Sequence, residues 1–152
     1  MSATPKLPAF ARLGLGLIFF VFGLNGFLSF LPMPPLDGGA GAFMGALAET
    51  GYMFPLIKGV EVVAGAALLA GVFVPLALLL LAPIVVNIAM FHLVLAPASL
   101  PLVVVILALG SYLAYAYRDA FAGVLQRKAL PLRKAETSRP APTRVSDVLA
   151  AR

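Results

Sequence analysis

The chain has 152 residues, of which 62% are hydrophobic and only 11% are charged, and its mean hydropathy is +1.04. A soluble domain of this length could not bury so much apolar surface, so the expected class is an integral membrane protein. With no cysteine and one histidine, His92, the chain cannot by itself supply disulfides, Cys-ligated zinc, iron–sulfur clusters or a bis-His haem. We therefore expect no metal site and no cofactor held by the chain alone.

Four stretches are long and apolar enough to cross the hydrocarbon of a membrane, which takes roughly 20 residues. The expected spans are residues 10–31, 53–73, 75–95 and 100–117. The turn-forming segments LPMPPLDGG, GVFVP and APASLP separate them. Because the last two connections are short, the last three spans should be antiparallel neighbours. The predicted fold class is an all-α membrane protein, a bundle of four transmembrane helices.

Basic residues lie at both ends of the chain. Lys6 and Arg12 flank the start of the first span, whereas residues 32–52 contain no lysine or arginine. The tail, residues 127–152, holds seven basic and two acidic residues and so accounts for the formal net charge of +5. The positive-inside rule then predicts that both the N-terminus, residues 1–9, and the tail are cytoplasmic. We expect the tail to be disordered and to bind no nucleic acid, because its basic residues are not interleaved with aromatic ones.

The long loop after the first span contains a short apolar pattern. Between Gly41 and Glu49, the residues Phe43, Met44 and Leu47 are spaced to share one face of a helix. This pattern predicts a short amphipathic helix at the outer membrane surface. Such a helix is either an ordinary connection pressed against lipid headgroups or a lid over something beneath it.

Five polar side chains lie in the outer halves of the expected spans. At about 1.5 Å per residue, Asn25, Glu61 and Asn87 share one layer, and Lys58 and His92 share the layer above it. Lys58 and Glu61 are three residues apart and therefore lie on one helix face. Asn87 and His92 are about 140° apart around an ideal helix, so they cannot both face the bundle centre unless the helix is locally rotated.

Two interpretations of these residues remain open. In the structural one, Lys58 and Glu61 neutralise each other, and the asparagines join neighbouring helices. In the functional one, all five side chains line an outward-opening polar pocket for a small head group such as a quinone ring, with which the buried glutamate could exchange a proton. The five residues are the candidate ligand-binding set, and no catalytic residue is assigned.

Several segments together resemble the DoxX family of small four-helix membrane proteins. They are RLGLGLIFFVFGLNGF, FPLIKGVEVVAGAALLAG, NIAMFHLVLAP and AYRDAF, and the likeness covers about residues 11–125. The segment with Lys58 and Glu61 is the most specific, while Asn25 stands where many family members carry a lysine. The resemblance implies a multi-pass protein of the bacterial inner membrane, linked to quinone-coupled oxidation and to membrane redox complexes.

The function that follows from this resemblance is an accessory or quinone-interacting component of a membrane redox system, with the lipid bilayer and a membrane redox protein as partners. The absence of cysteine and the single histidine favour a non-catalytic subunit over a self-contained enzyme. Two alternatives stay open. One is an assembly factor or chaperone for membrane proteins, and the other is a small-solute transporter, which with only four helices would need to form a homo-oligomer.

Overall fold

Four long helices make up most of the molecule. The computed structural model describes residues 6–32 and 34–124, so the basic tail, residues 127–152, lies outside the described residues. The long helices are α1 (Lys6–Leu28), α3 (Met53–Ala70), α4 (Val74–Val94) and α5 (Leu100–Ala116), which η1 (Pro97–Ser99) precedes. Each of α1, α3 and α4 is long and apolar enough to cross a membrane, and so is α5 when η1 is included. No strand occurs in the described part of the chain, so the all-helical class with four candidate spans is confirmed.

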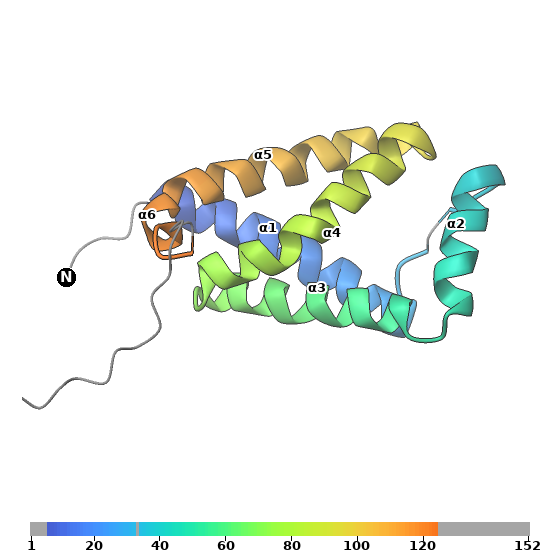
Figure 1. Cartoon of the computed structure of the whole chain (residues 1–152), viewed down its shortest axis with the longest axis horizontal. Helices are drawn as coiled ribbons and strands as arrows, with labels where there is room; N and C mark the ends of the chain where they lie inside the picture. The colour runs from blue at the N-terminus through green and yellow to red at the C-terminus, as the bar shows by residue number, and fades with distance from the viewer. Residues whose placement is uncertain (1–5, 33, 125–152) are drawn as a thin grey trace, which may run out of the picture.

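The four helices form a ring in which each packs against two others. α1 packs against α3 and α5, and α4 packs against the same two helices, so α1 and α4 are diagonal to each other. Figure 1 shows α4 crossing obliquely from the end of α3 to the start of α5. The expectation that the last three spans are neighbours in chain order is therefore confirmed. The buried apolar side chains of the ring are Ala11, Leu15, Phe19, Ala64, Leu68, Val74, Ala77, Leu81, Ile106 and Leu113.

The turn between α3 and α4 is tight because its backbone enters the left-handed region twice. Gly71 has a φ of +75°, which a glycine adopts without a steric penalty, and Phe73 has a φ of +51°. The amide groups of Gly71 and Val72 both donate to the carbonyl of Ala67, which satisfies the end of α3. The second span therefore ends at Ala70, three residues before the expected boundary.

The first span differs more from its expected limits, residues 10–31. α1 begins at Lys6 and ends at Leu28, after which Ser29 has a φ of +49°. The side-chain oxygen of Asn25 accepts a hydrogen bond from the amide of Leu31 at 2.6 Å. This bond turns the chain back over the last turn of α1, which explains why the helix stops before its apolar sequence does. The third and fourth spans end within one residue of expectation.

Helix α2 (Gly38–Glu49) occupies the loop after α1. It stands across one end of the bundle, as Figure 1 shows, while the N-terminal end of α1 and the short α6 (Arg118–Phe121) lie at the opposite end. Phe43, Met44 and Leu47 are partly buried, whereas the residues between them are mostly exposed. The apolar stripe therefore faces the protein, but the location of α2 at a membrane surface stays a prediction.

The outer surface of the ring is apolar. Leu17, Val63, Val86 and Val104, one from each long helix, are each more than half exposed. Four helices of this length bury only a minor part of their own apolar side chains against one another. The hydrophobic effect would oppose this arrangement in water, whereas lipid chains would cover the same surface. The fold is therefore consistent with a multi-pass membrane protein.

Candidate functional site

Lys58 and Glu61 form an ion pair on α3. The Lys58 ammonium donates a hydrogen bond of 2.7 Å to Oε2 of Glu61. The glutamate side chain is 3% exposed and the lysine side chain 19%, so the pair is largely withdrawn from the surface. The ammonium also lies 5.8 Å from the centre of the Phe54 ring, within the range of a cation–π contact. The expected pairing of Lys58 with Glu61 is confirmed, but a pair of this kind is compatible with both the structural and the functional interpretation.

Glycines of α1 make room for this pair. A Cβ on Gly26 would lie 2.5 Å from the Lys58 side chain, and a Cβ on Gly23 would lie 3.0 Å from the Cβ of Glu61. Further along the same seam, a Cβ on Gly65 would lie 2.6 Å from the backbone nitrogen of Phe20. Gly65 thus lets α1 approach α3 closely. The ion pair is built at the closest helix contact of the bundle, between α1 and α3.

Asn25 lies on α1 beside this seam but bonds elsewhere. It is 7% exposed, and its amide group makes hydrogen bonds with the backbone of Leu31, through Oδ1 at 2.6 Å and Nδ2 at 3.5 Å. Its side chain therefore fixes the end of α1 rather than joining α1 to another helix. This bonding accounts for the burial of Asn25 without any ligand.

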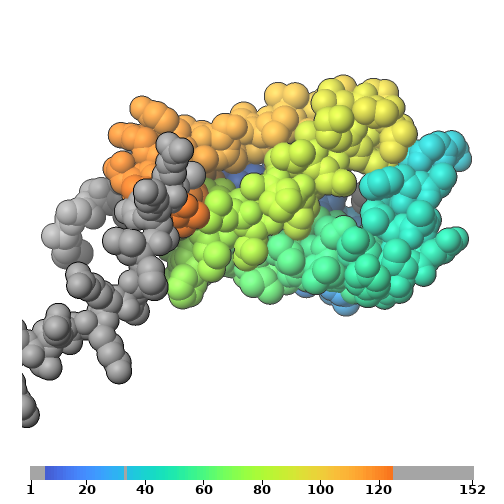
Figure 2. All heavy atoms as spheres, viewed as in Figure 1, coloured from blue at the N-terminus to red at the C-terminus, as the bar shows by residue number. Residues whose placement is uncertain are grey.

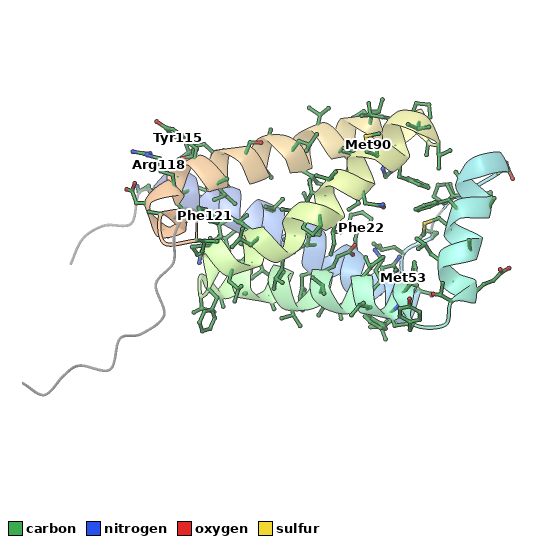
Figure 3. The ribbon with its side chains drawn as sticks, in the orientation of Figure 1. Phe22, Met53, Met90, Tyr115, Arg118 and Phe121 are labelled. Carbon is green, nitrogen blue, oxygen red and sulfur yellow. The ribbon has the colours of Figure 1, made fainter. Side chains whose placement is uncertain are left out.

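Asn87 lies on the side of α4 that faces α2. It lines a hollow of about 210 Å³ together with Phe43, Met90, Phe91, Val94 and Leu95. We call this space the α2–α4 hollow; Figure 2 shows the surface hollowed where α2 faces the end of α4. The rings of Phe43 and Phe91 have centroids 5.5 Å apart and cross at 42°. Figure 3 shows Met90 towards the α2 end of α4, far from Tyr115 and Arg118 at the other end of the bundle. Asn87 is thus an exposed polar group in a surface hollow that apolar and aromatic side chains otherwise line.

His92 lies on a different face of α4. Its Nδ1 is 2.8 Å from the carbonyl oxygen of Ile88, a partly buried residue that packs against the core. A carbonyl oxygen can only accept, so Nδ1 is the donor of this hydrogen bond. His92 also contacts Phe91 edge to face, with centroids 5.1 Å apart. Asn87 and His92 therefore have different surroundings, as their spacing along the helix predicts.

The five candidate residues fall into two groups. Lys58 and Glu61 lie at the α1–α3 seam with Asn25 beside them, while Asn87 and His92 lie on α4. Only Lys58 and Glu61 are hydrogen-bonded to each other. That all five line one pocket stays a prediction.

Of the residues that line the α2–α4 hollow, only Asn87 was chosen from the sequence as a candidate ligand-binding residue. Asn87, Met90, Phe91 and Val94 follow the spacing of one helix face, which is a usable signal. The contribution of Phe43 comes from a distant helix, and no local pattern reveals it. Within the described residues, no three histidine or carboxylate side chains gather closely enough to hold a metal ion. The expectation of no metal site stays a prediction.

Comparison with known proteins adds no family. No protein-family model, curated protein or solved structure matches this chain. The resemblance to the DoxX family therefore stays a prediction that rests on the segments quoted above.

Proposed function

We propose that this protein is an accessory component of a membrane redox system and that it holds the ring of a quinone in the α2–α4 hollow. The coarser part of this proposal, a multi-pass membrane protein, fits the four long apolar helices. One observation carries the finer part: Asn87 brings a single amide into a hollow that is otherwise lined by aromatic and apolar side chains.

The chemistry of the hollow suits a flat ring with oxygen atoms at its edges. The Asn87 amide group can donate to a quinone carbonyl and can accept from the hydroxyl of the reduced quinol, so one side chain serves both redox states. The side chains of Phe43 and Phe91 offer apolar surface to the quinone ring, and Met90 offers a polarisable sulfur. An isoprenoid tail would leave the hollow along the apolar outside of the bundle.

Electron transfer itself falls to a partner protein in this proposal. The chain has no cysteine and only one histidine, which are the residue types that hold iron–sulfur clusters and most haems. The protein would therefore bind and orient the ring for a membrane redox partner and would not be an enzyme on its own.

The proposed location is the cytoplasmic membrane of a bacterium, with both termini on the cytoplasmic side. The resemblance supports the bacterial assignment. The positive charges of Lys6 and Arg12 at one end, and the lack of lysine and arginine in residues 32–52, support the orientation.

The test is direct binding of a short-chain benzoquinone to the purified full chain in detergent, measured by equilibrium dialysis and chromatography. Asn87→Leu keeps the volume but removes the amide, and we expect it to weaken binding by about twofold to tenfold, because one hydrogen bond contributes roughly 0.5–1.5 kcal/mol. Ser111→Ala, which removes an exposed hydroxyl from α5, is the matched control and should leave binding unchanged.

Equal affinities of the wild type and the Asn87→Leu variant would contradict the proposed site. Absence of quinone binding in the wild type, together with a protein that co-purifies without cofactor, would instead favour the assembly-factor alternative.

A further inference from the structure

Arg12 is a second polar feature that the quinone proposal does not use. It lies on α1, and its guanidinium rests on Gly71, at the C-terminal end of α3; a Cβ on Gly71 would collide with Nη1. Its Nε is buried and has no hydrogen-bond partner among the residues that the structure describes. The negative end of the α3 dipole attracts a cation at this place but carries only about half a charge. Arg12 therefore keeps uncompensated positive charge and hydrogen-bonding capacity.

No carboxylate of the described residues neutralises Arg12. Glu61 is paired with Lys58, and Asp119, which is almost fully exposed, is paired with Arg118 at 3.9 Å. Asp37 directly precedes α2 and Glu49 is its last residue, at the other end of the molecule (Figure 1). A guanidinium that is partly buried in a membrane protein needs a counter-anion, because the low dielectric makes an unpaired charge costly. None of the described carboxylates provides that anion.

Arg12 lies near the start of the first candidate span, where the headgroup of a lipid would be within its reach. Arg12 lies about 9 Å along the axis from the start of α1, at 1.5 Å per residue. Beside it, in the turn between α3 and α4, Val72 and Phe73 are 50% and 74% exposed. A cation next to exposed apolar side chains matches an amphiphile with an anionic head and apolar chains.

We infer that Arg12 binds the phosphate of a phospholipid headgroup at the α3–α4 turn. The terminal nitrogens of an arginine form a fork that donates two parallel hydrogen bonds to phosphate oxygens, which a lysine cannot reproduce. The acyl chains of the lipid would pack against Val72 and Phe73. Free phosphate shares the head-group chemistry but lacks the chains.

The experiment is native mass spectrometry of the purified full chain in detergent, titrated with dioctanoyl phosphatidylglycerol, with dioctanoylglycerol and with inorganic phosphate. The wild type should bind the phospholipid at least tenfold more tightly than the diacylglycerol, which has the same chains but no phosphate. Arg12→Gln should lose about tenfold in affinity for the phospholipid, and Arg12→Lys should fall between the two.

Arg118→Gln is the matched control, because Arg118 is an exposed arginine at the same end of the bundle that already has a carboxylate partner (Figure 3). Its affinity for the phospholipid should stay within twofold of the wild type. Equal wild-type binding of phospholipid and diacylglycerol would overturn the inference without any variant, and so would an Arg12→Gln variant with unchanged affinity. Inorganic phosphate bound as tightly as the phospholipid would assign the site to the free anion.

Discussion

The Lys58–Glu61 pair shows how a single side chain can depend on its neighbour. Glu61 is almost fully buried, whereas Lys58 reaches towards the surface over Gly26. An isolated carboxylate at the position of Glu61 would lack both water and a counter-charge, so the lysine is needed even if the pair adds little net stability. The intact pair can therefore contribute little to the free energy of unfolding, although removal of one partner lowers that free energy strongly.

Replacing one partner should destabilise the protein more than replacing both. We expect Lys58→Met or Glu61→Leu alone to lower the free energy of unfolding by about 3–5 kcal/mol, and the double variant to be nearly neutral. Unfolding of the purified protein in mixed detergent micelles measures all three. A double variant less stable than either single variant would show that the pairing does not govern stability.

The same double variant separates the two interpretations of the pair. If the pair is structural, the stable double variant should bind the short-chain benzoquinone as the wild type does. If the pair belongs to the ligand site, the double variant should be stable but should bind more weakly. Arg118→Gln, which breaks an exposed pair, is the control and should change neither property by much.

Among the elements, α1 and α3 form the closest contact because small residues meet along it. A Cβ on Gly16 would lie 3.0 Å from the backbone nitrogen of Leu69, and a Cβ on Gly65 would lie 3.0 Å from the carbonyl oxygen of Gly16. These neighbours are backbone atoms, which cannot rotate away as a flexible side chain can. In a membrane, such close approach provides the van der Waals contact that holds helices together.

A methyl group at this seam should therefore force the helices apart. We expect Gly65→Ala to lower the free energy of unfolding by about 1–3 kcal/mol, as overpacking does elsewhere. Gly59→Ala, on the same helix, is the matched control because a Cβ there would meet no atom of the described residues within 4 Å. That variant should be neutral or stabilising by about 0.5–1 kcal/mol. Equal effects of the two substitutions would rule out the seam as the reason, and unfolding in detergent again provides the measurement.

At the scale of the whole molecule, four helices bring the two described ends of the chain to the same side. Lys6 and Arg118 lie at one end of the bundle, while α2 and its flanking residues lie at the other (Figure 1). The distribution of basic residues predicts that the end with Lys6 faces the cytoplasm.

Cysteine labelling in intact cells tests this orientation, since the chain has no cysteine of its own. We expect Asp37→Cys to react with a membrane-impermeant maleimide added from outside. Asp119 is also an exposed aspartate but lies at the opposite end of the bundle, so Asp119→Cys should react only after the cells are opened. The reverse pattern would mean that the bundle is inserted upside down, and reaction of both from outside would contradict the four-span topology.

The sequence alone determined the features that depend on local pattern. Four apolar stretches predict four helices, because a helix satisfies all backbone hydrogen bonds of a run of about 20 apolar residues in a membrane. The Lys58–Glu61 pair was also predictable from a local pattern, because residues three apart on a helix are neighbours whatever surrounds them. Hydropathy also predicted the helix ends to within about one to four residues, the largest misses coming from the chain reversal that Asn25 stabilises and from an earlier helix start.

Only the tertiary structure decided which polar groups share surroundings. Asn25 shares a layer with Glu61 in sequence, yet it bonds to Leu31 because the chain turns back there. Phe43 meets Phe91, and Arg12 meets Gly71, across large separations in the sequence. Such contacts depend on the rotation of each helix about its axis and on the angle at which two helices cross. The small residues of both helices at a seam determine these angles. A pattern within one helix does not predict these angles, because they are a property of two helices in contact.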